Sequence, residues 1–208
     1  MSNDQIIYDV AIKNGFTPVS AKLVVAQSRF ETADYTSAVF RQNYNTSGMK
    51  FANQPLAIKG TLAPYKERSA SCQAVTGGQV GGYGPPQCKS GDHYAKFPSV
   101  EISAKDKIER NFKITMGGVT PEQLKAATTP EQFADLLKRR RYYGDNPYGT
   151  SLGMAERDNY ARGLRAKLLR VQIIEFVKKY KFPIGGILLF ISGASFYYYF
   201  MKKKGLIK

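Results

Sequence analysis

The chain has 208 residues, enough for one domain with a buried core, and 31 Lys and Arg stand against 16 Asp and Glu. The formal charge of +15 indicates anionic surroundings, such as nucleic acid, an anionic membrane face or a cell-wall polymer, without choosing among them. Two cysteines and one histidine, His93, are too few for the four ligands of a structural zinc site. The sequence therefore predicts no metal site, and it assigns no cofactor.

The N-terminal residues predict two helices. The opening stretch "MSNDQIIYDVAIKNG" has no basic segment followed by an apolar run, so we expect no secretory signal peptide. Residues 3–14 are predicted to form a first helix that Gly15 ends. Thr17 as N-cap and Pro18 at the first helical position then predict a second helix, which runs to Glu31.

Glu31 stands where this helical pattern ends, and a polar loop with Asn45 and Gly48 follows it. It is either a solvated helix end or an acid placed in a cleft. Glycosidic bond cleavage needs a carboxylic acid that keeps its proton near neutral pH, and an apolar, half-buried setting provides this. The spacing of the residues alone does not decide between the two interpretations.

The middle of the chain has few helix signals. Residues 52–97 are predicted to form short strands and turns around a Gly-rich tip, in a β-lobe of about residues 60–97. Cys72 and Cys88 bracket the tip. In the chain-entropy description, a disulfide between them would stabilise the fold by about 3 kcal/mol, because it lowers the conformational entropy of the unfolded chain. We expect this disulfide, because the Gly-rich loop has little else to hold it; the alternative is two free thiols in a reducing cytosol.

Helices return after the β-lobe. Residues 99–114 are predicted to be helical, and two short helices follow, each opened by the same letters, "TPEQ". Thr120 and Thr129 are the expected N-caps, and Gln123 and Gln132 are expected to complete capping boxes.

The C-terminal part predicts a membrane anchor. A long helix is expected from about residue 155 to residue 179, and residues 182–201 then contain no formal charge. That length spans a bilayer as a helix, and lysines flank the stretch on both sides. The alternative is a buried core helix. We predict a transmembrane helix over 182–201, followed by a basic tail over 202–208.

Four stretches of the sequence resemble the motifs of one protein family, and they occur in the same order as in that family. "AQSRFETADYTS" followed by "NYNTSGMKF" resembles the glucosaminidase family, a branch of the lysozyme-like superfamily that cuts bacterial peptidoglycan. "HYAKFPSVEISAKDKIERNF" and "RRRYYGDNPYGTSLGMAERDNYARGLRAKL" are similar to later stretches of the family. The resemblance runs from about Thr17 to Leu169. The chain departs at Ala33, where the family usually has glycine, and at Ser47, where it usually has phenylalanine.

The resemblance implies a fold and an activity. The fold would be mainly α, a lysozyme-like α+β domain over residues 1–175 with a small β-hairpin lobe. The activity would be that of a glycoside hydrolase of the N-acetylglucosaminidase or muramidase type, with lytic transglycosylase chemistry also open. Glu31 would be the general acid.

The resemblance also implies further site residues. Asn45, Tyr143 and Tyr160 would be substrate-binding residues: Asn45 would orient the loop after the catalytic helix, and the two tyrosines would line the sugar cleft. The alternatives are a plain turn residue at Asn45 and ordinary helix packing of the tyrosines. Glu67 and Asp92 in the β-lobe are the candidates for a catalytic base or stabiliser. Their alternative is an ordinary surface charge on a hairpin.

Peptidoglycan and a lipid membrane, contacted through residues 182–201, are the expected partners. A peptidoglycan substrate, a C-terminal anchor and the expected absence of a signal peptide together suggest delivery by a membrane-containing bacteriophage. In this hypothesis the enzyme sits in the virion membrane; the alternative location is the bacterial cell envelope.

Two rival functions remain open. The first is a catalytically inactive wall-binding or structural virion protein on the same fold, because fold does not fix function. The second is a membrane-anchored nucleic-acid binder, suggested by charge alone. The sequence has no recognisable reading module, and aromatic residues do not alternate with the arginine run 139–141. We therefore expect no nucleic-acid partner and interpret the run as a solvated helix end.

Overall fold

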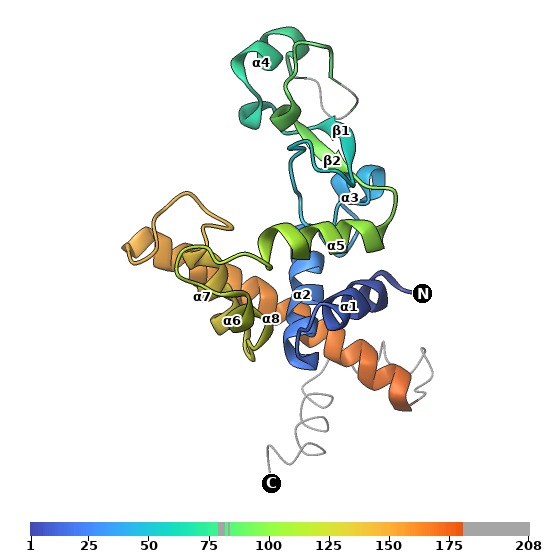
Figure 1. Cartoon of the computed structure of the whole chain (residues 1–208), viewed down its shortest axis with the longest axis vertical. Coiled ribbons are helices and arrows are strands. Elements are labelled where there is room, and N and C mark those ends of the chain that lie inside the picture. Colours follow the sequence, from blue (N-terminus) through green and yellow to red (C-terminus); the bar gives the residue numbers. More distant parts are fainter. Residues whose placement is uncertain (79–81, 83, 181–208) are drawn as a thin grey trace, which may run out of the picture. The chain divides into compact units, whose positions relative to one another are not determined.

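The computed structural model describes residues 1–78, 82 and 84–180. Its elements are α1 (Asn3–Lys13), α2 (Pro18–Glu31), α3 (Ala38–Asn43), β1 (Ile58–Leu62), α4 (Ala70–Thr76), β2 (His93–Lys96), α5 (Val100–Asn111), α6 (Pro121–Lys125), α7 (Pro130–Arg139) and α8 (Ser151–Tyr180), with 3-10 turns at Tyr65–Glu67 and Ser90–Asp92 (Figure 1). Residues Met1–Val171 form one compact unit and Gln172–Lys208 a second. The predicted class, mainly helical with one small antiparallel sheet, is confirmed.

The helix α2 begins and ends where the sequence predicts. The Thr17 hydroxyl accepts a hydrogen bond from the Ser20 amide at 3.2 Å, and Pro18 opens the helix. Residues 20, 21 and 23–29 are all buried. The helices α1, α6 and α7 pack against it (Figure 1). A helix buried on nearly every side is a core helix, so its last residue is positioned by the whole fold.

The two short helices α6 and α7 confirm one predicted capping box and correct the other. Thr120 accepts from the Gln123 amide, and the Gln123 side chain accepts from the Thr120 amide at 2.8 Å. Thr129 likewise accepts from the Gln132 amide, but the Gln132 side chain accepts from the Thr128 amide at 2.9 Å. The prediction of the second capping box was wrong, because the amide that donates to the Gln132 side chain belongs to Thr128 and not to the N-cap residue Thr129.

The β-lobe consists of more than a hairpin. β1 pairs antiparallel with β2, with Ile58 opposite Lys96 and Leu62 opposite His93. Between the strands lies α4, which the sequence did not predict. In Figure 1 the strand pair and α4 lie together, apart from α1, α2, α6 and α7. A helix this short is marginal by its own propensity, so it depends on the contacts that hold it.

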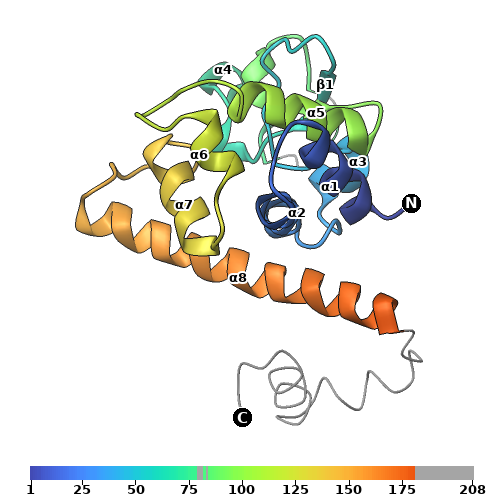
Figure 2. The same ribbon diagram turned by 60° about the horizontal axis from the view of Figure 1, so that its bottom comes forward.

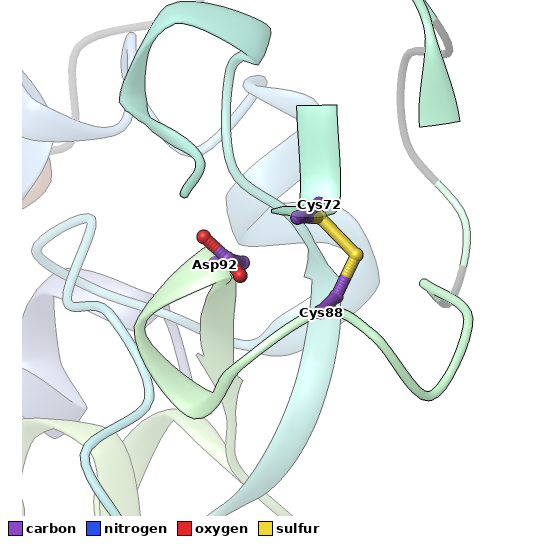
Figure 3. Close-up of side chains that lie close together, drawn as sticks. All are labelled: Cys72, Cys88 and Asp92. Atoms are coloured by element: carbon purple, nitrogen blue, oxygen red, sulfur yellow. A yellow bond between two sulfur atoms is a disulfide. The ribbon is translucent and has the colours of Figure 1, made fainter. Parts of the chain in front are cut away.

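Cys72 of α4 and Cys88 form the expected disulfide, with their sulfur atoms 2.01 Å apart (Figure 3). Asp92 lies beside them, and one potential ligand atom from each of the three residues falls within 4.8 Å of the others. Because the two sulfur atoms are bonded to each other, this group does not offer a set of thiolate metal ligands.

Within the first unit, the part of α8 up to Val171 runs alongside α7 and near α2 (Figure 2). The Phe30 ring packs edge-on against Tyr160, with ring centroids 5.2 Å apart. A Cβ atom at Gly163 would overlap the Phe30 ring, so glycine at this point of α8 permits the close approach. Phe30 directly precedes Glu31, and this contact therefore fixes the end of α2 against α8.

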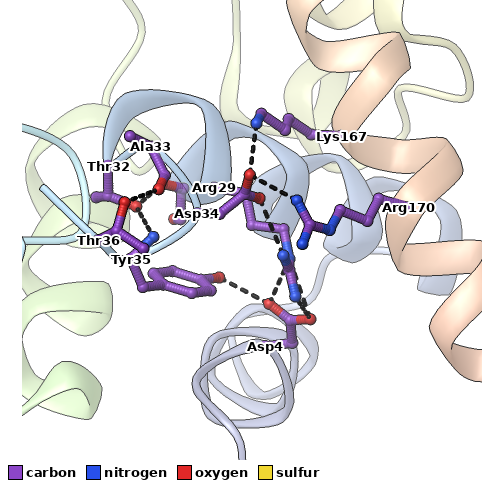
Figure 4. A network of polar contacts seen from close by, with 10 residues as sticks. Asp4, Arg29, Thr32, Ala33, Asp34, Tyr35, Thr36, Lys167 and Arg170 are labelled. Atoms are coloured by element: carbon purple, nitrogen blue, oxygen red, sulfur yellow. Dashed lines mark hydrogen bonds and ion pairs between the residues drawn. The ribbon is translucent and has the colours of Figure 1, made fainter. Parts of the chain in front are cut away.

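A buried ion pair also joins α1 to the end of α2. The Arg29 guanidinium donates from Nε and Nη2 to the two oxygens of Asp4, at 2.9 and 2.7 Å (Figure 4). Its Nη1 donates to Asp34 at 3.0 Å, and the Tyr35 hydroxyl donates to Asp4 at 2.8 Å. Burial disfavours the Arg29 charge, but these carboxylates outweigh it and raise the pKa of Arg29 above its ordinary value.

The same network continues to α8 through Asp34. Lys167 donates to Asp34 at 2.7 Å and Arg170 donates at 3.0 Å (Figure 4). Burial opposes ionisation of Asp34, yet its bonds to Lys167 and Arg29 hold its pKa below the usual range. Three helices are thus tied together by charge immediately after Glu31.

The backbone in this region is left-handed over three consecutive residues. Ala33, Asp34 and Tyr35 have φ angles of +48°, +57° and +68°. For residues such as Ala33 and Tyr35 this conformation costs about 1–2 kcal/mol relative to the right-handed region, whereas glycine and, at times, aspartate adopt it readily. Ala33 is the position where the resembled family usually has glycine, and the positive φ gives the physical reason. The network around Arg29 holds the turn in place despite this cost.

Among the described residues, no helix combines the length and the apolar character needed to cross a bilayer. The transmembrane helix predicted over 182–201 and the basic tail over 202–208 lie outside the described residues.

Candidate functional site

Glu31 is a partly buried carboxyl group at the C-terminal end of α2. The Tyr160 hydroxyl, from α8, donates a hydrogen bond to Glu31 Oε1 at 2.5 Å. The same hydroxyl accepts from Gln27 Nε2 at 3.2 Å, and Gln27 is fully buried one turn before Glu31. This chain of two hydrogen bonds holds the Glu31 carboxyl at a fixed orientation.

The surroundings of Glu31 favour its protonated form. Burial raises the pKa of Glu31 and is the largest influence on it. The hydrogen bond from Tyr160 and the charge of Lys107 both act in the opposite direction, but the pKa stays above its ordinary value. A carboxyl group that retains its proton toward neutral pH has the property that a general acid needs.

Lys107 of α5 is a fully buried lysine next to this acid. Its amine donates to Ser28 Oγ at 3.2 Å, and Ser28 lies one turn before Glu31 on α2. Among the described residues, no carboxylate forms an ion pair with this amine. Burial lowers the pKa of Lys107 to about 7, although the nearby Glu31 carboxylate opposes the shift.

A second buried lysine provides a contrast. Lys138 of α7 forms an ion pair with Glu156 of α8 and donates to the Tyr143 carbonyl at 3.3 Å. Glu156 also accepts from Asn146 Nδ2 at 2.8 Å. This cluster supports the loop after α7 that carries Tyr143. Lys138 is therefore paired with a carboxylate, whereas the Lys107 amine has a hydroxyl partner and lies 5.9 Å from the centre of the Phe112 ring.

Both predicted cleft tyrosines lie beside Glu31, in different positions. The rings of Tyr143 and Tyr160 are stacked, with centroids 3.9 Å apart and planes 5° apart. Tyr160 is only 7% exposed, so it contacts Glu31 from the side of the core. Tyr143 lines the cavity described below, and its hydroxyl donates to the Ala134 carbonyl at 2.8 Å. Their predicted role in substrate binding stays a prediction.

A cavity of about 460 Å³ opens beside Glu31. Its walls come from four segments that are distant in the sequence: the end of α2, the loop 47–49, the end of α5 with the loop after it, and residues 140–143. The lining residues include Glu31, Met49, Arg110, Asn111, Arg141 and Tyr143. The predicted acid thus meets solvent and a space large enough for a ligand.

Asn45 organises the loop that forms one wall of this cavity. Its Nδ2 donates to the carbonyls of Met49 at 2.7 Å and Ala95 at 3.0 Å, and its Oδ1 accepts from the Met49 amide at 3.0 Å. The side chain is fully buried and does not line the cavity. Gly48 has a φ of +64°, which lets the loop turn between Asn45 and Met49. In the structure Asn45 therefore holds the loop, and because it does not line the cavity, its predicted role in substrate binding stays a prediction.

The two candidates for a second carboxylate do not line the cavity beside Glu31. Glu67 is half exposed and forms an ion pair with Lys50 at 3.0 Å. Asp92 is buried and accepts from the Ser69 hydroxyl at 2.7 Å and the Lys89 amide at 2.6 Å. Burial opposes its ionisation, but the hydrogen bonds from Ser69 and Lys89 lower the pKa of Asp92. In the structure Asp92 ties together segments of the β-lobe, Glu67 pairs with Lys50 at the surface, and neither carboxylate lines the cavity with Glu31.

Sequence reasoning missed Lys107 and the arginines of the cavity. A lysine at a core position of α5, in the same helical stripe as Val100, Ala104 and Ile108, was the available signal. The run 139–141 was expected to be a solvated helix end, but Arg140 is buried and Arg141 lines the cavity. Nothing in the run itself distinguishes its three arginines.

We expect Lys107→Met to stabilise the fold at neutral and acidic pH. In the unfolded chain this amine titrates near 10.5, whereas in the folded chain it titrates near 7. Between these values the unfolded chain binds the proton and the folded chain does not, so the stability of the parent rises with pH. The gain from Lys107→Met should therefore be largest below pH 7 and should shrink toward pH 10.5 in urea unfolding.

Lys138→Met is the matched control for this prediction, and it should destabilise the fold because it leaves the Glu156 carboxylate without its buried partner. A loss of stability in Lys107→Met at pH 6, similar to that of the control, would contradict the account of Lys107.

The chain is similar to one known protein family and to two solved structures. Residues 6–170 match the Glucosaminidase family, described as mannosyl-glycoprotein endo-beta-N-acetylglucosaminidase, which confirms the resemblance drawn from the motifs. No curated protein matches the chain. A chain of a type VI secretion system effector–immunity complex from Pseudomonas protegens aligns with a TM-score of 0.45 and 17% identity, over 80% of this chain and 88% of that chain. The catalytic domain of the autolysin Auto from Listeria monocytogenes aligns with a TM-score of 0.44 and 20% identity, over 83% of this chain and 82% of its own. Because the family match covers most of the 208 residues, the chain belongs to the Glucosaminidase family and is a glycoside hydrolase.

Proposed function

We propose that the protein cleaves the glycan strand of bacterial peptidoglycan and that Glu31 is the general acid. The observation that carries this proposal is the position of Glu31 on the wall of the 460 Å³ cavity, with its pKa raised by burial. In this position the carboxyl group keeps its proton and also has access to a substrate. Family membership supplies the class of bond, a glycosidic bond next to an N-acetylated amino sugar.

The proposed step moves one proton. The Glu31 carboxyl group donates its proton to the glycosidic oxygen as the bond from that oxygen to the sugar carbon breaks. The sugar carbon then bonds to a water oxygen in hydrolysis, or to a hydroxyl oxygen of its own sugar in transglycosylation, and the incoming oxygen releases its proton. Glu31 then carries a negative charge, which the Tyr160 hydroxyl and the amine of Lys107 stabilise. Tyr143 supports the arrangement through its stack on Tyr160.

The high positive charge suits the proposed substrate. Peptidoglycan and the polymers attached to it are anionic, and a charge of +15 raises the local concentration of the enzyme on such a surface. The same initial proton transfer begins hydrolysis and transglycosylation. Analysis of the product ends, as reducing sugars or as anhydro sugars, distinguishes the two reactions.

Glu31→Gln should abolish cleavage of purified peptidoglycan while the protein stays folded. An amide cannot donate the required proton, and loss of a general acid lowers a rate by about 10²- to 10⁴-fold. Release of soluble fragments from the wall measures the activity, and circular dichroism checks the fold. Glu101→Gln, an exposed glutamate of α5, is the matched control and should retain the parent rate. Equal rates in the parent and in Glu31→Gln would remove Glu31 from the proposal. A folded but inactive parent would instead favour a wall-binding protein.

Tyr160→Phe should shift the pH dependence of the reaction. The Tyr160 hydroxyl lowers the pKa of Glu31 by donating to its ionised form, so its removal should raise that pKa further. The basic limb of the kcat/KM profile, which reports the proton of the free acid, should then move to higher pH. Tyr143→Phe is the matched control, because its hydroxyl donates to a backbone carbonyl and does not contact Glu31. The same shift in both variants, or a shift in neither, would contradict the role of the Tyr160 hydroxyl.

We also propose that residues 182–201 attach the protein to a membrane. The support is the uncharged stretch of bilayer-spanning length with lysines on both sides. The full chain should float with lipid vesicles in a density gradient, and deletion of 182–201 should abolish flotation; flotation of the deleted chain would contradict this anchor.

Delivery on the internal membrane of a bacteriophage is the further part of this proposal. Absence of the protein from purified virions would overturn it.

A further inference from the structure

A second cavity lies next to the catalytic cavity. It has a volume of about 400 Å³ and is lined by Gly117, Gly118, Arg139, Arg141, Pro147 and Tyr148. Arg141 lines both cavities, so the two cavities meet at this residue. A ligand that extends from the first cavity into the second therefore passes Arg141.

The loop that forms one wall of the second cavity is held firmly in place. The buried guanidinium of Arg140 donates to the carbonyls of Ile114 at 2.7 Å and Val119 at 3.0 Å, on both sides of the glycine pair. A Cβ atom at Gly117 would overlap the carbonyl of Arg139, so glycine lets the loop pack directly on the end of α7. Burial without a carboxylate lowers the pKa of Arg140 from its ordinary value.

Arg141 is exposed and held in an unfavourable backbone conformation. Its φ is +54°, in the left-handed region, which costs about 1–2 kcal/mol for a residue other than glycine. Its guanidinium has no hydrogen bond or ion pair with any residue that the structure describes. A strained backbone that presents an unpaired charge to two cavities is typical of a ligand-binding position.

The rest of the second cavity favours an anionic ligand. The Arg139 guanidinium lies 5.2 Å from the centre of the Tyr148 ring. The nearby carboxylate of Asp135 is shared among three groups, since it accepts from the Tyr148 hydroxyl at 2.9 Å and pairs with Arg157 and Arg139 at 3.5 and 3.8 Å. It therefore cannot neutralise Arg139 and Arg141 together, and the cavity keeps a net positive charge beside an aromatic ring that is 41% exposed.

We propose that this second cavity binds a carboxylate of the peptide that branches from the glycan strand. This inference rests on the proposed function, because it assumes a peptidoglycan substrate. The amino sugars of the strand are neutral once their acid groups are amide-linked, whereas the branching peptide carries free carboxylates. The planar fork of an arginine suits a carboxylate, which it binds through two parallel hydrogen bonds. The cavity thus distinguishes glycan whose peptides carry free carboxylates from glycan whose peptides carry none.

The test measures binding without turnover. The full chain carrying Glu31→Gln is sedimented, in detergent, with wall that has been freed of phosphate-containing polymers. One portion of the wall is left untreated, and in the other portion ammonia and a carbodiimide have converted the free carboxylates of the peptides to neutral amides, which leaves the cross-linked wall intact. We expect about tenfold tighter binding to the untreated wall, a magnitude typical of one charge-assisted hydrogen-bonded pair. Adding Arg141→Gln should reduce this preference to about twofold or less.

Arg162→Gln is the matched control. Arg162 is an exposed arginine of α8 that lines neither cavity, so its variant removes the same charge and should keep the tenfold preference. Equal binding to both walls, or a preference that survives Arg141→Gln, would overturn the inference. A preference that appears only when the phosphate-containing polymers are left on the wall would also overturn it, in favour of phosphate recognition. Failure of the proposed function appears separately, as a parent enzyme that releases no fragments.

Discussion

The burial of α2 is the constraint on which the rest of the site depends. Nearly every residue from 20 to 29 is enclosed, so the helix carries its final carboxyl group out of the core and onto the wall of a cavity. Burial gives the acid a raised pKa, and the end of the helix gives it access to solvent. A glutamate in the middle of this helix would have only the first property, and one in an exposed loop only the second. General acid chemistry needs both.

Charge fixes the end of α2 where packing alone would leave it free. Arg29 and Asp34 join α1, α2 and α8 directly behind Glu31, and they hold a left-handed turn that alanine at position 33 disfavours. Buried ion pairs give little net stability, because desolvation offsets most of the attraction. Their contribution here is to position the helices. A buried charge left without its partner is costly, so the arrangement of the three helices that pairs these charges is favoured over others. Precise placement of the acid follows from that arrangement.

The two buried lysines illustrate how one residue type serves two purposes. Lys138 has a carboxylate partner and supports the loop that carries Tyr143, as a structural ion pair does. Lys107 has a hydroxyl partner and lies close to Glu31, so its charge is poorly compensated and its proton is weakly held. Natural proteins retain such unfavourable groups chiefly at functional sites, where stability is exchanged for chemistry. The energetic cost of Lys107 and its position next to the acid are consistent with that pattern.

Local rules in the sequence determined the helices around the site, and the family resemblance pointed to Glu31 as the candidate acid. Thr17, Pro18 and the spacing of apolar residues placed α2, and the motif order placed Glu31 at its end, because capping and periodicity act over a few residues. They did not determine α4, whose short stretch has no strong helical signal and depends on a disulfide to Cys88. Nor did they reveal Lys107, Tyr160 as the partner of the acid, or the different fates of Arg140 and Arg141. Lys107 and Tyr160 depend on contacts between residues more than 70 positions apart, such as Lys107 with Ser28 and Tyr160 with Glu31. Arg140 depends on burial and on its bonds to the carbonyls of Ile114 and Val119. Only the tertiary structure sets the local dielectric, and therefore it alone decided which charged residues became part of the site.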